Sequence, residues 1–256
     1  MTRKIFRDIT AIILIVAGSL FASICSAAPE ETPEQAIQRY TIEIQRNPNN
    51  ADAYFHRGKA YGDTKQYESA VQDYTKALGL NPNYQSAYFE RGLIYLNFLK
   101  RYEEAVADYN KLIELNPNYA ANAYTNRGAA YANLEQYDAA IADYNKALEL
   151  DPNNTLAYNN RGRAYFFIKQ YNRAIQDYTK AIELNPNFYQ AYTNRGSAYA
   201  LLLNISKAIE DATKAIELNP NDATAYQLRG ICYKFLDETT KAQSDFDKAK
   251  ELGHNS

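Results

Sequence analysis

A block of 34 residues recurs along the chain, and this repetition constrains the fold more than any other feature of the sequence. A chain of 256 residues would otherwise be expected to form one large or two small globular domains. The copy at residues 121–154 shows the recurring side chains, which are Tyr124, Arg127, Gly128, Tyr131, Ala140, Asp143 and Pro152. Repeated blocks form an array that grows in one dimension, because each block packs against its neighbours and needs no single large core.

Six full copies cover residues 51–84, 85–120, 121–154, 155–188, 189–222 and 223–252, and positions are counted here within each copy. Position four is Tyr, positions seven and eight are Arg-Gly, position eleven is Tyr, position twenty is Ala and position twenty-three is Asp in every copy. Two extra residues interrupt the register. One lies between Tyr95 and Tyr102, where we expect the turn between two helices, and the other is Ala120, between the second and third copies.

Each copy has the pattern of two helices. Tyr at four and eleven with Gly at eight forms one face of a first helix, and Ala at twenty and twenty-seven marks one face of a second. Gly inside a helix costs about 1 kcal/mol relative to Ala, so its return in every copy indicates close approach of the two helices. The Pro that closes five of the six copies stops the second helix and turns the chain.

Arg at position seven and Asp at position twenty-three recur together in all six copies. We interpret them as an ion pair that joins two helices of one copy or of adjacent copies. Removing the Asp alone would be costly if the Arg is substantially buried, because it would leave an unpaired charge.

The motif reads Tyr-x-x-Arg-Gly-x-x-Tyr, then Ala-x-x-x-Tyr-x-x-Ala, then Asn-Pro, and it resembles that of the tetratricopeptide repeat (TPR) family. The resemblance covers residues 33–252. It implies an all-α fold, a right-handed superhelical solenoid of antiparallel helix pairs with a concave inner groove. It also implies that the chain binds other proteins or peptides and carries out no bond chemistry.

The two ends of the array differ from its middle. Residues 36–46 match a second helix without its first, so residues 33–50 are predicted to be a half unit that caps the array. Thr32 as N-cap, with Pro33 at the first helical position, favours a helix start there. Residues 239–252 become polar and are interpreted as a capping helix, followed by a tail at 253–256.

Residues 1–28 differ in kind from the repeats. They begin with three basic residues among the first seven, continue with an almost wholly apolar run at 11–21, and end in small residues. This order is typical of a secretory signal peptide, so we predict a signal peptide at 1–28 and a linker at 29–32. The protein is then expected to be exported, to the periplasm or outside the cell.

Two other interpretations of this segment stay open. Cys25 would carry a lipid in a lipoprotein, although Ile24 is bulky for such a signal. Residues 9–25 would act as a membrane anchor if they were not cleaved, although the apolar run is short for a span of roughly 20 residues.

The sequence predicts neither an enzyme nor a cofactor or metal site. His56 and His254 are the only histidines and lie at opposite ends of the chain. Cys232 occupies a position where most other copies have Ala, so a buried core role is expected. The net charge of −2 gives no basic stripe for nucleic acid.

Partner binding is predicted on the first helices, at positions two, five, six, nine, twelve and thirteen, which leave the Tyr/Gly/Tyr face. The polar candidates are Asn122, Thr125, Asn126, Asn159, Asn160, Arg163, Thr193 and Asn194. The apolar candidates are Phe55, Phe89, Phe166 and Phe167. Because an Asn side chain both donates and accepts, a row of them can hold the backbone of an extended peptide. The alternative is an ordinary solvated helix face.

Some members of the family hold the C-terminal carboxylate of a peptide with Lys, Asn and Arg at fixed inner positions. The corresponding residues here are Phe55, Lys59, Glu90, Asn122 and Asn126, which lack the basic pair. The sequence therefore disfavours that mode of binding.

The favoured hypothesis is an exported scaffold that binds a protein or peptide in its groove. One alternative is self-association into a homo-oligomer through the unpaired helix at 36–46, which light scattering with and without residues 29–50 would detect. The other is an adaptor held on the membrane by residues 9–25.

Overall fold

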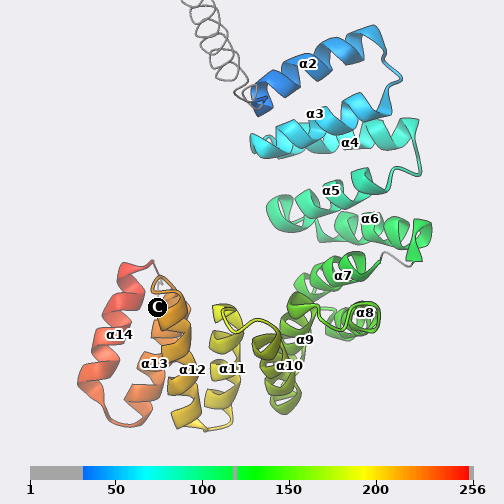
Figure 1. Ribbon diagram of the computed structural model, residues 1–256. Helices are drawn as coiled ribbons and strands as arrows, with labels where there is room; N and C mark the ends of the chain where they lie inside the picture. Colours follow the sequence, from blue (N-terminus) through cyan, green and yellow to red (C-terminus); the bar gives the residue numbers. More distant parts are fainter. Residues whose placement is uncertain (1–30, 118–119, 254–256) are drawn as a thin grey trace, which may run out of the picture.

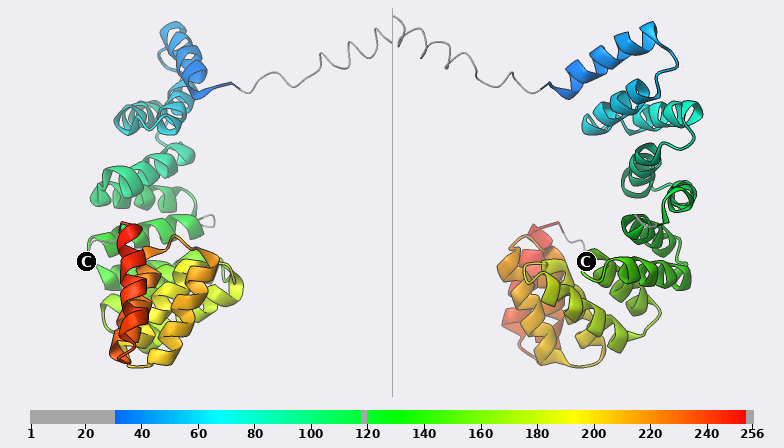
Figure 2. Two further views of the ribbon diagram at one scale, coloured as in Figure 1. Left: turned by 90° about the vertical axis from the view of Figure 1, so that its left-hand side faces the viewer. Right: turned by 45° about the vertical axis from the view of Figure 1, so that its right-hand side comes forward.

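The computed structural model describes residues 31–117 and 120–253, which form α-helices and one short π-helix, with no strand in these ranges. The helices stack in chain order as antiparallel pairs, and the stack bends through α7 to α10 into a hook (Figure 1). Figure 2 shows α2 and α14 at the two ends of this hook. The helices are α2 (Pro33–Arg46), α3 (Ala51–Asp63), α4 (Tyr67–Leu80), α5 (Gln85–Ile94), η1 (Tyr95–Leu99), α6 (Tyr102–Leu115), α7 (Ala121–Asn133), α8 (Tyr137–Leu150), α9 (Thr155–Phe167), α10 (Tyr171–Leu184), α11 (Tyr189–Leu201), α12 (Ile205–Leu218), α13 (Ala223–Phe235) and α14 (Thr239–Glu251). The predicted all-α solenoid of helix pairs is confirmed.

Several predictions concern residues that the structure does not describe. The signal peptide at 1–28, linker residues 29–30 and tail residues 254–256 lie outside the described ranges. Within those ranges, none of the helices has the length and apolar character needed to span a membrane.

Gly at position eight lets the two helices of a unit approach closely. The side chain that fills this space comes from position twenty-four: a Cβ on Gly162 would lie 2.7 Å from Cε1 of Tyr178. The tyrosines at position twenty-four, which are Tyr74, Tyr109, Tyr144 and Tyr178, are each no more than 1% exposed. The fifth unit has Ala212 there, and Leu228 from the next unit reaches towards Gly196 instead.

The predicted ion pair forms in all six units. Arg127 illustrates it: Nε donates to Oδ2 of Asp143 at 2.8 Å and Nη2 to Oδ1 at 2.6 Å. Its remaining nitrogen, Nη1, donates to Asn110 of the preceding unit. The residues that accept this third bond in the six units are Thr41, Thr75, Asn110, Asn145, Thr179 and Thr213. Each guanidinium therefore joins three helices and fixes one unit against the previous one.

Two loop features repeat with the helices. After the second helix, an Asn or Asp accepts a hydrogen bond from the backbone N–H two residues later, as Asp151 does from Asn153. This Asx turn explains the Asn-Pro and Asp-Pro pairs. Between the two helices, one residue adopts positive φ in every unit, and these residues are Lys65, Lys100, Glu135, Lys169, Leu203 and Asp237.

The extra residue of the second unit was predicted to lie in the turn between the two helices, and this prediction is wrong. The residue is taken up inside the first helix, whose last turn widens into the π-helix η1 at Tyr95–Leu99. The turn itself closes as in the other units, because Arg101 N–H donates to the Tyr95 carbonyl where Gln66 N–H donates to that of Tyr61. A single-turn π-helix is a common way to accommodate one inserted residue.

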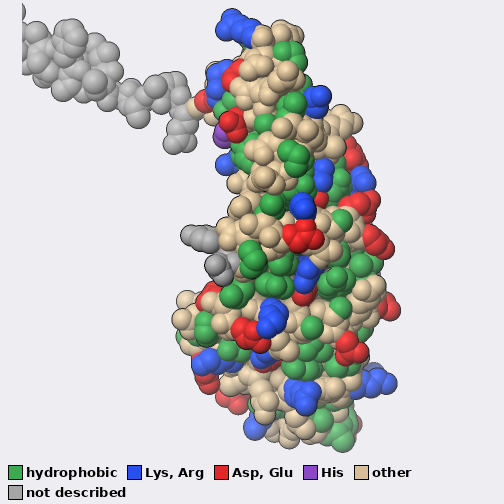
Figure 3. Space-filling view, turned by 90° about the vertical axis from the view of Figure 1, so that its right-hand side faces the viewer, with side chains coloured by type: hydrophobic (Ala, Val, Ile, Leu, Met, Phe, Trp, Pro, Cys, Tyr) green, Lys and Arg blue, Asp and Glu red, His purple; other side chains and the backbone are tan. Residues whose placement is uncertain are grey.

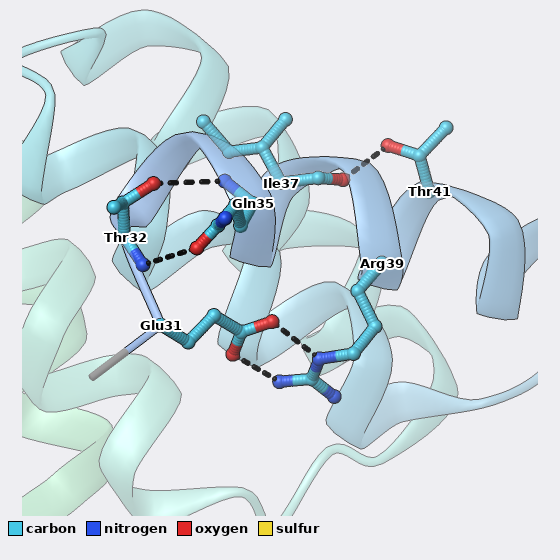
Figure 4. A network of polar contacts seen from close by, with 6 residues as sticks. All are labelled: Glu31, Thr32, Gln35, Ile37, Arg39 and Thr41. Atoms are coloured by element: carbon cyan, nitrogen blue, oxygen red, sulfur yellow. Dashed lines mark hydrogen bonds and ion pairs between the residues drawn. The ribbon is translucent and has the colours of Figure 1, made fainter. Parts of the chain in front are cut away.

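The half unit at the start of the array has the predicted N-cap. Figure 4 shows the Thr32 hydroxyl accepting from the Gln35 N–H while the Gln35 side chain accepts from the Thr32 N–H. α2 packs on α3, and its Thr41 accepts a hydrogen bond from Arg57. None of its residues is fully buried, and Ile42 remains 48% exposed.

Candidate functional site

The prediction that position five lines the groove is wrong for four of its five candidates. Phe89 is half-buried, whereas the other four are at most 8% exposed: Phe55, Thr125, Asn159 and Thr193. The reason is that these side chains pack against the start of the next first helix. Thr193 donates to Asp222, the N-cap of α13, at 2.7 Å, and the Phe55 ring packs 4.8 Å from that of Tyr84, the N-cap of α5. They therefore join successive helix pairs.

The asparagines of position six, by contrast, are half-buried. Asn126, Asn160 and Asn194 come from the middle of α7, α9 and α11. Asn194 Nδ2 donates to Oδ1 of the buried Asn159 at 3.0 Å, and Asn159 Nδ2 donates in turn to Oδ1 of Asn160 at 3.3 Å. This chain of amides fixes the orientation of Asn160, whose Nδ2 donates to none of the described residues.

A small hollow, called here the Arg163 hollow, lies between α7 and α9. Its volume is about 60 Å³. The residues that line it are Ala129, Ala132, Asn133, Tyr144, Asn160, Arg163, Ala164 and Phe167. Two of the predicted polar candidates, Asn160 and Arg163, therefore meet in one place.

A second hollow, the Glu90 hollow, lies between α5 and α7 and has a volume of about 240 Å³. The residues that line it are Gln85, Ser86, Phe89, Glu90, Leu112, Asn116, Asn122 and Ala123. Burial raises the pKa of Glu90, an effect that Lys59 opposes and Asp63 reinforces. The hollow brings the predicted residues Phe89 and Asn122 together beside an acidic group.

The two aromatic candidates of the fourth unit have different roles. Phe167 is 53% exposed, stacks on Tyr137 with ring centres 5.3 Å apart, and lines the Arg163 hollow. Phe166 is half-buried and packs edge-on against Tyr171, with ring centres 5.5 Å apart. Phe167 is thus available to a partner, whereas Phe166 supports the helix pair.

Sequence reasoning did not expect every lining residue. Ala129 and Ala132 occupy positions nine and twelve, which were predicted to face the groove, and their small side chains leave room for the Arg163 hollow. The buried Tyr144, a core residue of the repeat, was not expected in its lining. Two small residues one turn apart on an otherwise polar helix face are a signal that could have indicated a depression. Glu90 was considered only as one of the residues that stand where some family members bind a carboxylate with basic side chains.

The rest of the described surface is mixed in character. On the face shown in Figure 3, Lys and Arg are interspersed with Asp and Glu, and no broad patch carries a single sign. Cys232 is 1% exposed, which confirms its predicted place in the core. Among the described residues, no group of three His, Cys, Asp or Glu is arranged to hold a metal ion.

The stacked helix pairs and the hollows between their first helices define a helical-repeat interaction scaffold. A tetratricopeptide repeat model matches residues 51–84, 121–154, 155–188 and 189–222. Related TPR models match residues 99–135 and 212–249. The chain belongs to the tetratricopeptide repeat family, whose fold typically serves as a scaffold for protein interactions and not as an enzyme.

Solved structures with the same architecture agree with this assignment. A crystal structure of MamA is 30% identical over 59% of this chain and 88% of its own, with a TM-score of 0.54. YrrB, described as a TPR protein with an unusual peptide-binding site, is 26% identical over 73% of this chain and 95% of its own, with a TM-score of 0.57. A TPR protein from Parabacteroides merdae, 24% identical over 88% of each chain with a TM-score of 0.72, shares the fold. No match was found among functionally curated sequences.

Proposed function

We propose that the protein binds an extended segment of a peptide or protein partner in the groove formed by its first helices. The observation that carries the proposal is the pair of hollows on successive first helices, one lined by Phe89 and Asn122 and the other by Asn160 and Phe167. YrrB, which is described as having a peptide-binding site, provides support from a similar structure.

Recognition would combine main-chain hydrogen bonds with apolar anchoring. The half-buried amides of Asn126, Asn160 and Asn194 can donate to and accept from a peptide backbone. The rings of Phe89 and Phe167 line the two hollows and can contact apolar side chains of the partner.

The scaffold is well suited to binding without rearrangement. Each Arg at position seven fixes its unit to the preceding one through a third hydrogen bond, for example from Arg161 to Asn145 at 2.7 Å. A rigid groove loses little conformational entropy when a partner binds, which favours affinity.

The triple variant Asn126→Ala, Asn160→Ala, Asn194→Ala is expected to weaken partner binding about tenfold or more, because several hydrogen bonds are lost together. Binding would be measured by cross-linking pull-down from the exported compartment, followed by titration of the captured partner. The matched control is Asn83→Ala, Asn153→Ala, Asn172→Ala, which removes three exposed asparagines outside the first helices. Equal binding by both variants, with circular dichroism showing an intact fold, would rule out this use of the groove.

We also propose that the protein is exported and that a signal peptide within residues 1–28 is removed. This proposal rests on the basic start, apolar run and small-residue end of that segment. Mass spectrometry of the purified extracytoplasmic protein is expected to find an N-terminus at residue 28 or 29. An intact Met1 would support a membrane-anchored adaptor instead, and a lipid on Cys25 would support a lipoprotein.

A further inference from the structure

We propose that the Arg163 hollow receives a carboxylate from the bound partner, with the Arg163 guanidinium as its principal ligand. The inference rests on the proposed groove function and adds the chemistry of the partner: an acidic peptide, bound through an Asp or Glu side chain or through its free C-terminus.

Arg163 differs from the arginines of position seven in having no ionic partner among the residues that the structure describes. All six of those form ion pairs with Asp within the same unit. Arg163 is exposed and has neither an ion pair nor a side-chain hydrogen bond with any residue between 31 and 117 or 120 and 253. Its positive charge is therefore not neutralised within the fold.

The groups around Arg163 are mainly hydrogen-bond donors. Asn160 already accepts from Asn159 through Oδ1, so its free Nδ2 is a donor. Tyr144 is 1% exposed, lines the hollow, and its hydroxyl forms no hydrogen bond with the described residues. Tyr144 and Arg163 both line the hollow; burial raises the pKa of Tyr144, and the positive charge of Arg163 opposes this rise.

No acidic residue lines the Arg163 hollow. Asp143, which precedes the lining residue Tyr144 in the sequence, is already held by both oxygens in the ion pair with Arg127. Asn133 donates its Nδ2 to the Ala129 carbonyl at 2.8 Å, which leaves its Oδ1 as an acceptor for a peptide N–H. A guanidinium, an amide N–H and a hydroxyl can together donate hydrogen bonds to the two oxygens of a carboxylate, and no carboxylate of the protein lines the hollow to compete for them.

The Glu90 hollow provides the contrast. It lies one unit earlier in the array and contains a carboxyl group with no cation among its lining residues. An acidic group of the partner is attracted at Arg163 and not at Glu90, whose charge Lys59 partly offsets, so the two hollows favour one direction of the bound peptide. The lining of the Arg163 hollow also differs from the Lys, Asn and Arg set that some family members use for a C-terminal carboxylate.

The probe is a synthetic pool of randomised decapeptides, half with free and half with amidated C-termini, selected on the purified full chain and sequenced by mass spectrometry. Selected peptides are expected to be enriched in Asp, Glu or a free C-terminus at one place. Resynthesis with Asn, Gln or an amide at that place identifies which carboxylate binds.

Arg163→Gln is expected to lower the affinity of the selected peptide about 10- to 100-fold, since a charge-assisted hydrogen bond is lost. Arg163→Lys should retain part of the affinity. The matched control is Arg173→Gln, which removes the same charge from an exposed site on α10 and should leave the affinity within about twofold. Selection without an acidic preference, or equal affinity in Arg163→Gln, would overturn the carboxylate site but leave the groove function standing. No selection at all would contradict both.

Discussion

Replacing Asp143 with Ala is expected to lower the free energy of unfolding by about 3 kcal/mol. The Arg127 side chain is 17% exposed, and two of its three hydrogen bonds end on Asp143. Without Asp143, the guanidinium is left largely buried with a single bond, to Asn110. Such a loss exceeds the cost of removing an exposed ion pair, because the desolvation of the remaining charge is no longer compensated.

The control is Glu149→Ala on the same helix, α8. Glu149 pairs with Lys146 three residues earlier, and both side chains are more than half exposed. Water screens this pair, so its loss should be small. Urea unfolding followed by circular dichroism would measure both variants. Equal stability of the two would contradict a structural role for the recurring Arg and Asp.

Gly162→Ala is expected to destabilise the chain by about 1–3 kcal/mol, although Ala normally favours a helix. The new Cβ would lie 2.7 Å from Cε1 and 2.9 Å from Cδ1 of the Tyr178 ring. Tyr178 is 1% exposed, so its ring has no free space into which it can move. The two helices of the fourth unit would have to separate.

Gly79→Ala is the matched control, and it is expected to change the stability in the opposite direction. Gly79 also lies inside a helix, α4, but nothing comes within 4 Å of a Cβ placed on it. The substitution should therefore stabilise the protein by about 0.5–1 kcal/mol, through the conformational entropy of the unfolded chain. If both variants were more stable than the wild type in urea unfolding, close packing would not explain the recurring Gly.

Much of the fold could be predicted because the same contacts recur within every unit. The spacing of Tyr, Gly and Ala identifies the helix faces, and Arg with Asp identifies the ion pair. The capping box at Thr32 also follows from local sequence, since its hydrogen bonds join residues three apart. Such features depend on contacts within one unit or within a few residues, which the spacing of side chains in the sequence determines.

The candidate site was predicted less well because it depends on how units face one another. Position five points away from the Tyr/Gly/Tyr face, yet in four of the six copies the start of the next first helix covers it, as it does Asn159 and Thr193. Nothing within one copy indicates this. The position of the inserted residue of the second unit also could not be predicted from one copy. It lies in η1, which leaves the closing hydrogen bond from Arg101 to Tyr95 as in the other units.

The sequence by itself determined the scaffold: its helix pairs, their order, the ion pair in each unit and the Pro that follows the second helix in five of the six units. The tertiary structure decided which variable side chains a partner can reach. The physical reason is that burial and hollows arise between units, where Ala129 and Ala132 of one first helix lie opposite Arg163 of the next. A repeat pattern describes each unit alike, whereas a binding surface depends on the different neighbours that its residues meet.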